Sequence, residues 1–460
     1  MSARYPGRVS LQALVLSVLL VASLPLAGPS VIAATGTGPV DDQGPQNILL
    51  ITVDTTRADY LSCYGSALLT TPNIDALARR GVRFDAATAV IPLTGPGHAS
   101  MLTGLYPRDH GAIRNGVPVA EDIPTLATIL SARGYTTAAF ISGWTLRTQV
   151  IGLHRGFDHF DDSMTDRYHA VNDQRLGDQT ADMAVAWLEE KRDGPFFLWV
   201  HFFVPHEPFT DHKMELAPNP AARVAAPEKD VLQRYSQEVA FADLQVGRVL
   251  AALEKSGAVD DTMILLTSDH GEAFGEHGTK GHGRELYQTT QNVPMILVHP
   301  LVGRNKVSDL PVSTLDVTPT LLDLLDLPPV MESDGVALGQ ALVAPGSFAG
   351  RAIYQETFPG ARKKFWGLFG PKLTGDPTMV AVRRGGWKAI YNPKKDILEL
   401  FDLSSDPTET RDLSGELSVR AGRFKPLLTS HAQRAWRPAG TETALSDEDR
   451  KRLESLGYID

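Results

Sequence analysis

Thr94 stands where an apolar run meets a turn, in the segment VIPLTGPGHASMLTGLYP. Gly-Pro-Gly follows it at once, and a helix-like stretch from His98 to Leu102 comes next and ends at Gly104. This pattern presents the Thr94 hydroxyl at a helix N-terminus, where free N–H groups and the positive end of the helix dipole gather. Such a place suits a nucleophile that attacks an anionic ester, because the same groups hold the anion. A simple helix cap is the alternative interpretation.

Three apolar runs end in residues that can bind a metal ion or move a proton. The runs and the residues after them are Asn47–Val53 with Asp54, Pro195–Phe203 with His206, and Thr262–Thr267 with Asp269 and His270. In open α/β sheets, ligand groups gather at the carboxyl ends of the strands, so we expect these side chains to meet. Carboxylates, one imidazole and a threonine oxygen suit a hard or borderline divalent cation.

A glycine- and histidine-rich stretch, GEHGTKGHG, follows the third run. It supplies His277, Lys280 and His282. We expect Lys280 and His282 to reach the same site, and His277 to be a surface residue or to lie behind the residues that touch the substrate.

Strand-like and helix-like segments alternate over residues 46–345, which predicts an α/β domain with a large, mostly parallel sheet flanked by helices. The expected strands are the three runs above with Thr136–Ile141 and Val293–Val298, and the expected helices are Thr71–Gly81, Pro124–Arg133, Gln174–Arg192, Tyr235–Ser256 and Thr314–Leu325. From about residue 346 the pattern changes to short strands separated by turns, which predicts a small antiparallel α+β subdomain over 346–430. Residues 431–460 read as a tail with a helix over Ser446–Leu456.

Composition excludes several classes of protein. The 460 residues are 43% hydrophobic and 21% charged, which is ordinary for a globular protein. The net charge of −10 disfavours a nucleic-acid partner. The single cysteine, Cys63, rules out an intrachain disulfide and a cysteine-based zinc site.

The first 34 residues have the features of a secretion signal. Arg4 and Arg8 precede the apolar stretch Leu11–Ala27, and small residues suitable for cleavage lie near Ala34. Residues 35–45 read as a flexible lead-in. An uncleaved anchor is the alternative, but the apolar stretch is short and interrupted. We therefore expect a secreted or periplasmic protein with no stable membrane span after cleavage.

From Asn47 to Asp412 the chain resembles the sulfatases of the alkaline phosphatase superfamily. The segments that carry the resemblance, in matching order, are NILLITVDTTRADYLSCYG, TPNIDALARRGVRF, PLTGPGHASMLTGLYPRDHGAIRNG, HFFVPHEPF, LLTSDHGEAFGEHG and LELFDLSSDPTETRDL. The resemblance implies a hydrolase with one divalent metal ion that acts on a small-molecule, glycan or lipid sulfate or phosphate ester.

The resemblance also implies roles for residues. It assigns the metal to Asp54, Asp269 and His270 together with Thr94, which is also the nucleophile that attacks sulfur or phosphorus in line. It places His206 and His282 on the substrate group, and one of the two would protonate the leaving oxygen. The remaining substrate-binding positions that it implies are His98, Asn115 and Lys280.

The chain departs from the sulfatase pattern at the nucleophile. Sulfatases have Cys or Ser there and convert it to formylglycine, whereas threonine is not a substrate for that conversion, so no formylglycine is expected. The usual arginine is His98, and the second acid of the usual Asp-Asp pair is Thr55. A threonine ester must be hydrolysed by water or passed to an acceptor, so a phosphodiesterase, a phosphonate hydrolase or a phospho-group transferase acting on envelope molecules stays an alternative. A catalytically inactive glycan-binding protein is a third. The metal stays open between manganese, zinc, calcium and magnesium, and the Asp269-His270 pair favours the first two.

Overall fold

The computed structural model describes residues 46–164, 166–168, 172–214, 216–219, 230–330, 332–343, 348, 350–359 and 375–438. The predicted signal peptide, the lead-in and the helix over Ser446–Leu456 lie outside these residues. Within the described part of the chain, no helix combines the length and the apolar character needed to cross a bilayer.

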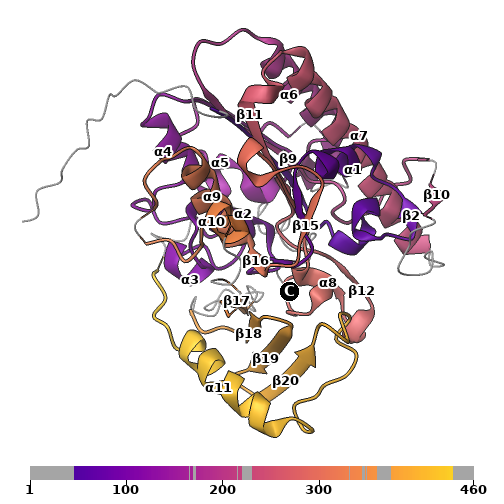
Figure 1. Ribbon diagram of the computed structural model, residues 1–460, viewed down its shortest axis with the longest axis vertical. Helices are drawn as coiled ribbons and strands as arrows, with labels where there is room; N and C mark the ends of the chain where they lie inside the picture. Colours follow the sequence, from indigo (N-terminus) through magenta and orange to yellow (C-terminus); the bar gives the residue numbers. More distant parts are fainter. Residues whose placement is uncertain are drawn as a thin grey trace, which may run out of the picture. The chain divides into compact units, whose positions relative to one another are not determined.

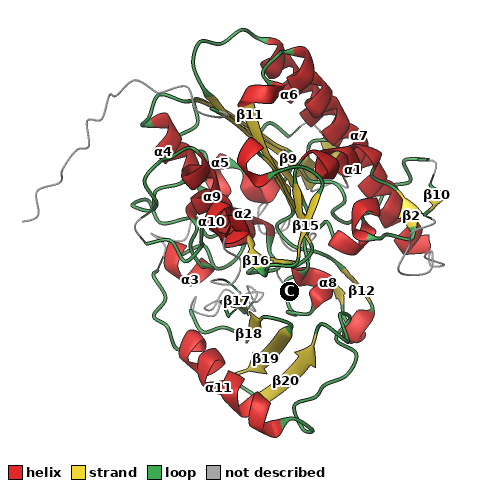
Figure 2. Cartoon of the chain, in the orientation of Figure 1, coloured by secondary structure: helices red, strands yellow, loops and turns green. Residues whose placement is uncertain are grey.

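An eight-stranded sheet forms the centre of the larger domain, with helices on both faces (Figures 1 and 2). In spatial order its strands are β15 (Lys306–Ser308), β3 (Val82–Phe84), β14 (Met295–Val298), β11 (Thr262–Thr267), β1 (Asn47–Val53), β9 (Phe196–Phe202), β5 (Thr136–Ile141) and β6 (His159–Asp161). β1 pairs in parallel with β11 and β9, so that Leu50 lies opposite Leu265 and Trp199. Only β14 runs against the others among these eight strands, which confirms the predicted mostly parallel sheet.

The helices bury the two faces of β1 separately, because successive side chains of a strand point to opposite faces. Ile48 and Leu50 pack with one set of helices, and Leu49 and Ile51 with another. The first set includes α2 (Thr94–Thr103), α4 (Leu126–Ser131), α9 (Val317–Leu324) and α10 (Leu338–Val343). The second set is α1 (Pro72–Arg80), α6 (Gly177–Glu189) and α7 (Asp230–Lys255). Both faces of the strand are therefore apolar, which explains its unbroken hydrophobic sequence.

Short elements complete the larger domain. The helices are α3 (Pro107–His110), α5 (Thr148–Ile151) and α8 (Gln288–Gln291). The two-stranded pairs are β2 (Leu68–Leu69) with β10 (Ala217–Pro218), β4 (Ala87–Thr88) with β16 (Val312–Ser313), β7 (Asp166–Tyr168) with β8 (Asn172–Gln174), and β12 (Ala273–Phe274) with β13 (Lys280–Gly281).

A four-stranded antiparallel sheet follows at the C-terminal end. Its strands are β17 (Ala352–Thr357), β18 (Met379–Arg384), β19 (Trp387–Asn392) and β20 (Ile397–Asp402), each paired with the next. α11 (Ser418–Ala432) covers one face through Phe424 and Leu428, and Leu286 of the larger domain packs on the other. The predicted strands are confirmed, but α11 is an element that the sequence analysis missed, and it crosses the predicted boundary at 430.

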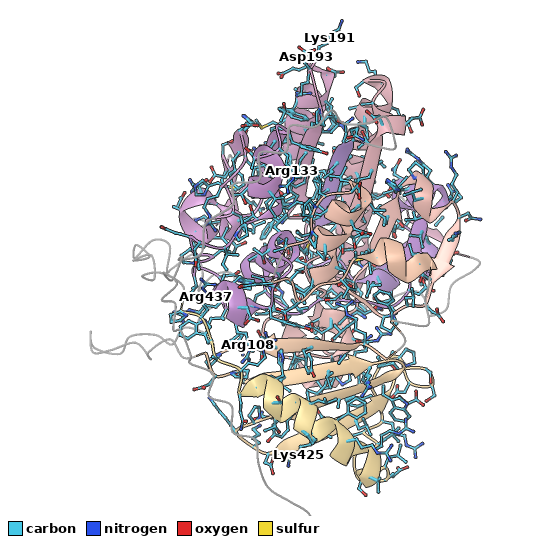
Figure 3. The ribbon with its side chains drawn as sticks, turned by 60° about the vertical axis from the view of Figure 1, so that its left-hand side comes forward. Arg108, Arg133, Lys191, Asp193, Lys425 and Arg437 are labelled. Atoms are coloured by element: carbon cyan, nitrogen blue, oxygen red, sulfur yellow. The ribbon has the colours of Figure 1, made fainter. Side chains whose placement is uncertain are left out.

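A buried ion cluster joins the two parts of the chain. Arg108 of α3 is fully buried, and its Nη2 lies 2.7 Å from Oε2 of Glu356 in β17. Nε2 of His431 in α11 lies 3.2 Å from the same oxygen. Figure 3 shows Arg108 at the border with the C-terminal sheet, far from the labelled Lys191 and Asp193. Since a buried charge is costly when it is unpaired, Arg108 and Glu356 depend on each other.

Candidate active site

The loop after β1 is held in one conformation by Tyr235 of α7. The Tyr235 hydroxyl donates to the carbonyl oxygen of Thr55 at 2.7 Å and accepts the N–H of Arg57 at 3.0 Å. Thr55 itself has φ 48°, in the left-handed region that a β-branched residue rarely adopts. This bend turns the chain sharply at the end of β1 and leaves Asp54 fully buried.

The loop after β11 is tied to the first loop by two hydrogen bonds. The Thr55 N–H donates to Oδ1 of Asp269 at 3.1 Å, and the Thr56 N–H donates to Oγ of Ser268 at 2.9 Å. The Ser268 hydroxyl in turn donates to the carbonyl oxygen of His270 at 2.7 Å. Asp54, Asp269 and His270 are therefore brought together from two neighbouring strand ends, as the sequence predicts.

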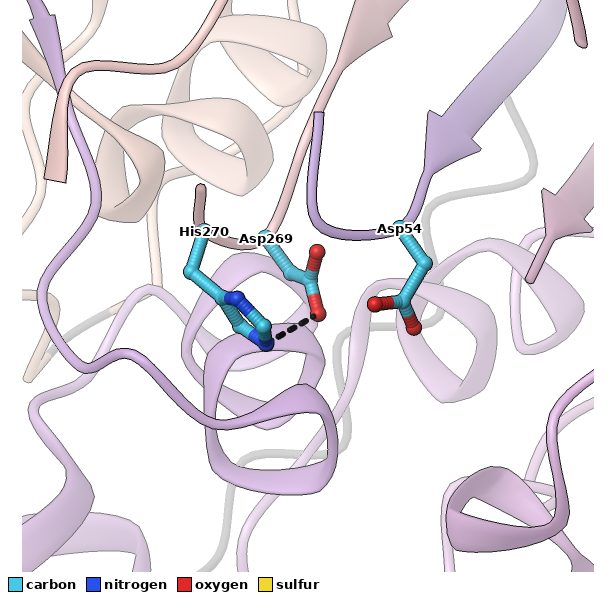
Figure 4. A group of neighbouring side chains, drawn as sticks. All are labelled: Asp54, Asp269 and His270. Carbon is cyan, nitrogen blue, oxygen red and sulfur yellow. Dashed lines mark ion pairs between the residues drawn. The ribbon is translucent and has the colours of Figure 1, made fainter. Parts of the chain in front are cut away.

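The orientation of His270 follows from its hydrogen bond. Its Nδ1 lies 3.0 Å from the carbonyl oxygen of Gly271, which only accepts, so Nδ1 carries the proton. Nε2 is then unprotonated, and it lies 3.3 Å from Oδ2 of Asp269 (Figure 4). An unprotonated imidazole nitrogen is the form that binds a metal ion.

These three residues fit a divalent cation. One ligand atom from each lies within 4.8 Å of the others. Among the described residues, Oδ1 of Asp54, Oδ2 of Asp269 and Nε2 of His270 are buried without a hydrogen-bond partner. Burial and the nearby charge of Asp269 raise the pKa of Asp54 well above its usual value. A cation between the two carboxylates would supply the missing partner and relieve their repulsion.

Thr94 lies beside this cluster at the start of α2. It is fully buried, and its hydroxyl hydrogen-bonds the Asp54 carboxylate, which favours the charged form of that acid. A Cβ added to Gly97 would come 3.3 Å from Cβ of Asp269, so the absence of a side chain there lets the helix approach the loop after β11 closely. The structure thus brings Thr94 together with Asp54, Asp269 and His270.

Two N–H groups at the start of α2, those of Gly95 and Gly97, are already used. The Gly95 N–H donates to Oδ1 of Asn115 at 2.8 Å, the Gly97 N–H donates to the carbonyl oxygen of Leu93 at 2.8 Å, and Pro96 has no N–H. Nδ2 of Asn115, in contrast, is buried and has no hydrogen-bond partner among the described residues. Asn115 therefore carries a donor at the N-terminus of α2 that the backbone of this first turn does not supply.

His282 and His206 form a chain of rings that starts at His270. The centroids of the His270 and His282 rings are 4.4 Å apart, and those of His282 and His206 are 5.0 Å apart. Nδ1 of His282 lies 3.1 Å from Oε2 of Glu272, and Nδ1 of His206 lies 2.6 Å from the carbonyl oxygen of Glu207. Each ring is thus oriented by a fixed oxygen at its Nδ1.

Burial decides the charge of this group. It lowers the pKa of His206 to about 3 and that of His282 to about 4, so both rings are neutral at pH 7. Burial also raises the pKa of Glu272 to about 7. Glu272 is therefore a buried acid whose protonation changes near neutrality in this structure.

The two other predicted substrate-binding residues, His98 and Lys280, differ in burial: His98 is buried and Lys280 is exposed. His98 is buried, and both of its ring nitrogens contact protein atoms: Nδ1 lies 2.8 Å from the Thr94 carbonyl oxygen, and Nε2 lies 3.1 Å from Oγ1 of Thr52. Lys280 is exposed in β13, and its charge partly opposes the rise in the pKa of Glu207 that burial causes. The ring of His277 stacks on Tyr287 at 3.8 Å.

Two residues of the site were missed in the sequence. His201 lies inside β9, and its Nε2 is 3.2 Å from Oδ2 of Asp54. Glu272 follows His270 closely and contacts His282. The available signal was an imidazole within the apolar run PFFLWVHFF, because a buried polar side chain needs a partner.

Comparisons with known proteins show the family of the chain. The sequence profile of the Sulfatase family matches residues 46–327. An N-acetylglucosamine-6-O-sulfatase of Bacteroides thetaiotaomicron is 26% identical to the chain, over 94% of each protein.

Two solved structures extend the likeness. One was solved in complex with its substrate D-glucosamine-2-N,6-O-disulfate and shares the fold with a TM-score of 0.68 at 22% identity. The alignment covers 89% of this chain and 100% of that chain. A phosphonate monoester hydrolase of Agrobacterium radiobacter has a TM-score of 0.64 at 26% identity and covers 85% of this chain and 96% of its own. With a matching profile over most of its length and the predicted residues gathered at its strand ends, the chain belongs to the sulfatase family.

Proposed function

We propose that this protein is a secreted, divalent-cation-dependent hydrolase of sulfate or phosphate esters that uses Thr94 as its nucleophile. One observation carries the proposal: the Thr94 hydroxyl hydrogen-bonds Asp54 inside a cluster whose buried ligand atoms lack partners. A hydroxyl that served only as a helix cap would bond to the backbone of its own helix instead.

A divalent cation at Asp54, Asp269 and His270 would lower the pKa of a bound hydroxyl and neutralise charge on the ester. The Thr94 hydroxyl gives its proton to the Asp54 carboxylate with which it hydrogen-bonds, and its Oγ1 forms a bond to sulfur or phosphorus while the bond to the leaving oxygen breaks. The leaving oxygen takes its proton from the group formed by His206, His282 and Glu272. Nδ2 of Asn115 donates to an oxygen of the transferred group. Water hydrolyses the Thr94 ester in a second step and restores the free hydroxyl.

The class of ester stays open between two candidates. The N-acetylglucosamine sulfatase and the structure with a sulfated glucosamine support a sulfated glycan. Thr94 itself favours the second candidate, a phosphodiester or phosphonate, because it is not a formylglycine precursor. The relative that hydrolyses phosphonate monoesters supports that second candidate. Secretion rests on the signal-like features of residues 1–34.

The test is turnover of matched aryl sulfate, phosphate monoester, phosphodiester and phosphonate substrates. The mature protein is stripped of metal and reloaded with manganese, zinc, calcium or magnesium in turn. We expect one ester class to be preferred and cleavage to require a cation. Addition of an acceptor alcohol separates hydrolysis from transfer: turnover that depends on the acceptor would replace the hydrolase by a transferase.

The matched variants are Thr94→Ser, which keeps a hydroxyl, and Thr94→Ala, which does not. We expect Thr94→Ser to keep measurable activity and Thr94→Ala to lose at least about 10³-fold in kcat while it still binds cations. Mass spectrometry of the quenched wild-type protein should show one added sulfuryl or phosphoryl group on the peptide with Thr94. Full activity of Thr94→Ala would overturn the proposal, and absence of cleavage under every condition would favour a glycan-binding protein.

A further inference from the structure

Two buried histidines contact the cluster of Thr94, Asp54 and Asp269: His98 lies next to Thr94 and Asp269, and His201 lies next to Asp54. Their ring centroids are 4.9 Å apart and the rings meet edge to face, at 87°. His98 is 1% exposed and His201 is fully buried. They come from different elements, α2 and β9, and they meet at the end of β1.

The hydrogen bonds of His201 are compatible with only one tautomer of its ring. The Ser142 N–H lies 3.4 Å from Nδ1, and since an N–H group only donates, Nδ1 is unprotonated. The ring proton is therefore on Nε2, which lies 3.2 Å from Oδ2 of Asp54 and donates to it. This bond occupies Oδ2 of Asp54, whereas Oδ1 is buried without a hydrogen-bond partner among the described residues.

The hydrogen bonds of His98 leave the opposite tautomer. Its Nδ1 lies 2.8 Å from the carbonyl oxygen of Thr94, which only accepts, so Nδ1 carries the proton. Nε2 lies 3.1 Å from Oγ1 of Thr52, which already accepts the indole N–H of Trp199 at 3.0 Å. The Thr52 hydroxyl is then free to donate to Nε2. Both ring nitrogens of His98, the Thr52 hydroxyl and the Trp199 indole N–H therefore all have partners.

We infer that His98 and His201 are positioning residues of the proposed reaction: His98 fixes the carbonyl of the nucleophile Thr94, and His201 fixes the metal-binding carboxylate of Asp54. The inference rests on the proposed function for the roles of Thr94 and Asp54. It replaces the substrate-binding role that the sequence predicts for His98, because both ring nitrogens of that residue are already bonded to the protein.

The two histidines act on different properties. A residue that orients a metal ligand changes metal affinity, typically 10- to 100-fold when it is lost. A residue that orients a nucleophile changes kcat, and a displacement of about 1 Å costs about 10²-fold. Loss of His201 is therefore expected to weaken cation binding, and loss of His98 is expected to slow the chemical step at saturating cation.

The experiment compares variants that keep one nitrogen with variants that keep none. For His201, Gln places an N–H near Nε2, whereas Phe keeps the ring without a donor. For His98, Asn places an N–H near Nδ1, and Phe again removes the donor. His159→Phe is the matched control, since His159 is exposed in β6. Binding of Mn²⁺ and Zn²⁺ to the metal-free proteins is measured by calorimetric titration, and kcat and KM are measured separately at saturating cation.

We expect His201→Phe to bind the cation 10- to 100-fold more weakly and His201→Gln to recover most of that loss. We expect His98→Phe to lose about 10²-fold in kcat with cation affinity within about threefold, and His98→Asn to recover much of kcat. Wild-type cation affinity in His201→Phe, or wild-type kcat in His98→Phe, would overturn the inference. Equal losses in the Phe variants and in the variants that keep a nitrogen would also overturn it, because they would indicate packing alone.

If a Phe variant does not fold, a second pair of variants is compared for each histidine. His201→Asn fills the position of Nδ1 but does not reach Asp54, so His201→Gln should bind the cation more tightly than His201→Asn. Thr52→Val removes the donor to His98, whereas Thr52→Ser keeps it, and only Thr52→Val should lower kcat. Cation binding is measured without turnover, so the part of the inference that concerns His201 is decided even when Thr94→Ala retains activity and the proposed nucleophile fails.

Discussion

The N–H of Thr55 donates to Oδ1 of Asp269 at 3.1 Å, which joins the loop after β1 directly to the loop after β11. The two loops belong to neighbouring parallel strands but are separated by more than 200 positions of sequence. The bond exists because Thr55 adopts the left-handed conformation and turns its N–H toward the second loop. Thr55 thus links the two loops that carry Asp54 and Asp269. A substitution of its side chain is therefore a way to change the candidate metal site.

Thr55→Asp should tighten cation binding about tenfold, because it adds a third carboxylate beside Asp54 and Asp269. Aspartate tolerates the left-handed conformation better than threonine, so the loop is expected to keep its shape. Without a cation the added charge should lower the free energy of unfolding. Thermal unfolding with and without Mn²⁺ or Ca²⁺ checks both effects. Thr55→Asn is the control, and an equal gain in affinity in that variant would contradict a charge effect.

Addition of a cation to the wild-type protein should raise its stability through Asp54, Asp269 and His270. A ligand at 100 times its dissociation constant adds about 2.7 kcal/mol to the free energy of unfolding when it binds only the folded state. Thermal unfolding before and after chelation measures the effect. His270→Ala should lose most of the gain, whereas His159→Ala, on the surface, should keep it. An unchanged gain in His270→Ala would place the cation elsewhere.

Tyr235→Phe should loosen the loop after β1. The variant leaves the carbonyl of Thr55 and the N–H of Arg57 without their buried partner. Each buried polar group that loses its partner costs about 1–3 kcal/mol of the free energy of unfolding. Urea unfolding should show the loss, and cation affinity should fall because Asp54 is less constrained. Tyr60→Phe, which alters a ring 4.7 Å from Tyr235, is the control for hydroxyl removal. Equal effects of the two variants would mean that the loop bonds contribute nothing specific.

Acid should weaken the link between the larger domain and the C-terminal sheet. Although burial alone would raise the pKa of Glu356, His431 and Arg108 hold it at about 2, below the ordinary value of 4.5. A folded-state pKa below the unfolded value gives stability that is complete above about pH 4.5 and is lost as the pH falls toward 2. The linked contribution is on the order of 3 kcal/mol.

Glu356→Gln should remove this part of the pH dependence and lower the free energy of unfolding at pH 7 by about 3–5 kcal/mol, because Arg108 stays buried. Chemical unfolding between pH 2 and pH 7 provides the comparison. Glu416→Gln, which breaks only an exposed pair with Arg411, is expected to follow the wild type. A Glu356→Gln curve parallel to that of the wild type would show that the cluster does not titrate as described.

The strand ends were predictable because the residues that matter there stand directly after long apolar runs. Asp54, Asp269 and His270 could be placed at one edge of a sheet from that position alone. The direction of β14 could not be obtained in the same way, since a short buried run has the same composition in a parallel and in an antiparallel pair.

Residues that support the site from within an element were harder to find. His201 lies in the middle of β9, and its partner Asp54 is distant in sequence. The role of His98 depends on Thr52 and Trp199, which lie on two other strands. These pairings arise from the register of β1 against β9, in which Thr52 lies opposite His201, and the register is set by three-dimensional packing.

The pairing of Arg108 with Glu356 and His431 also constrains how this protein can be rebuilt. A chimera that takes its C-terminal sheet from another family member must bring an acid that meets Arg108, or must replace Arg108 at the same time. A truncation before α11 removes His431 and exposes the opposite side of the same acid. The C-terminal sheet and the helix that holds Arg108 are therefore coupled through this acid, and an exchange of one without the other would leave a buried charge unpaired.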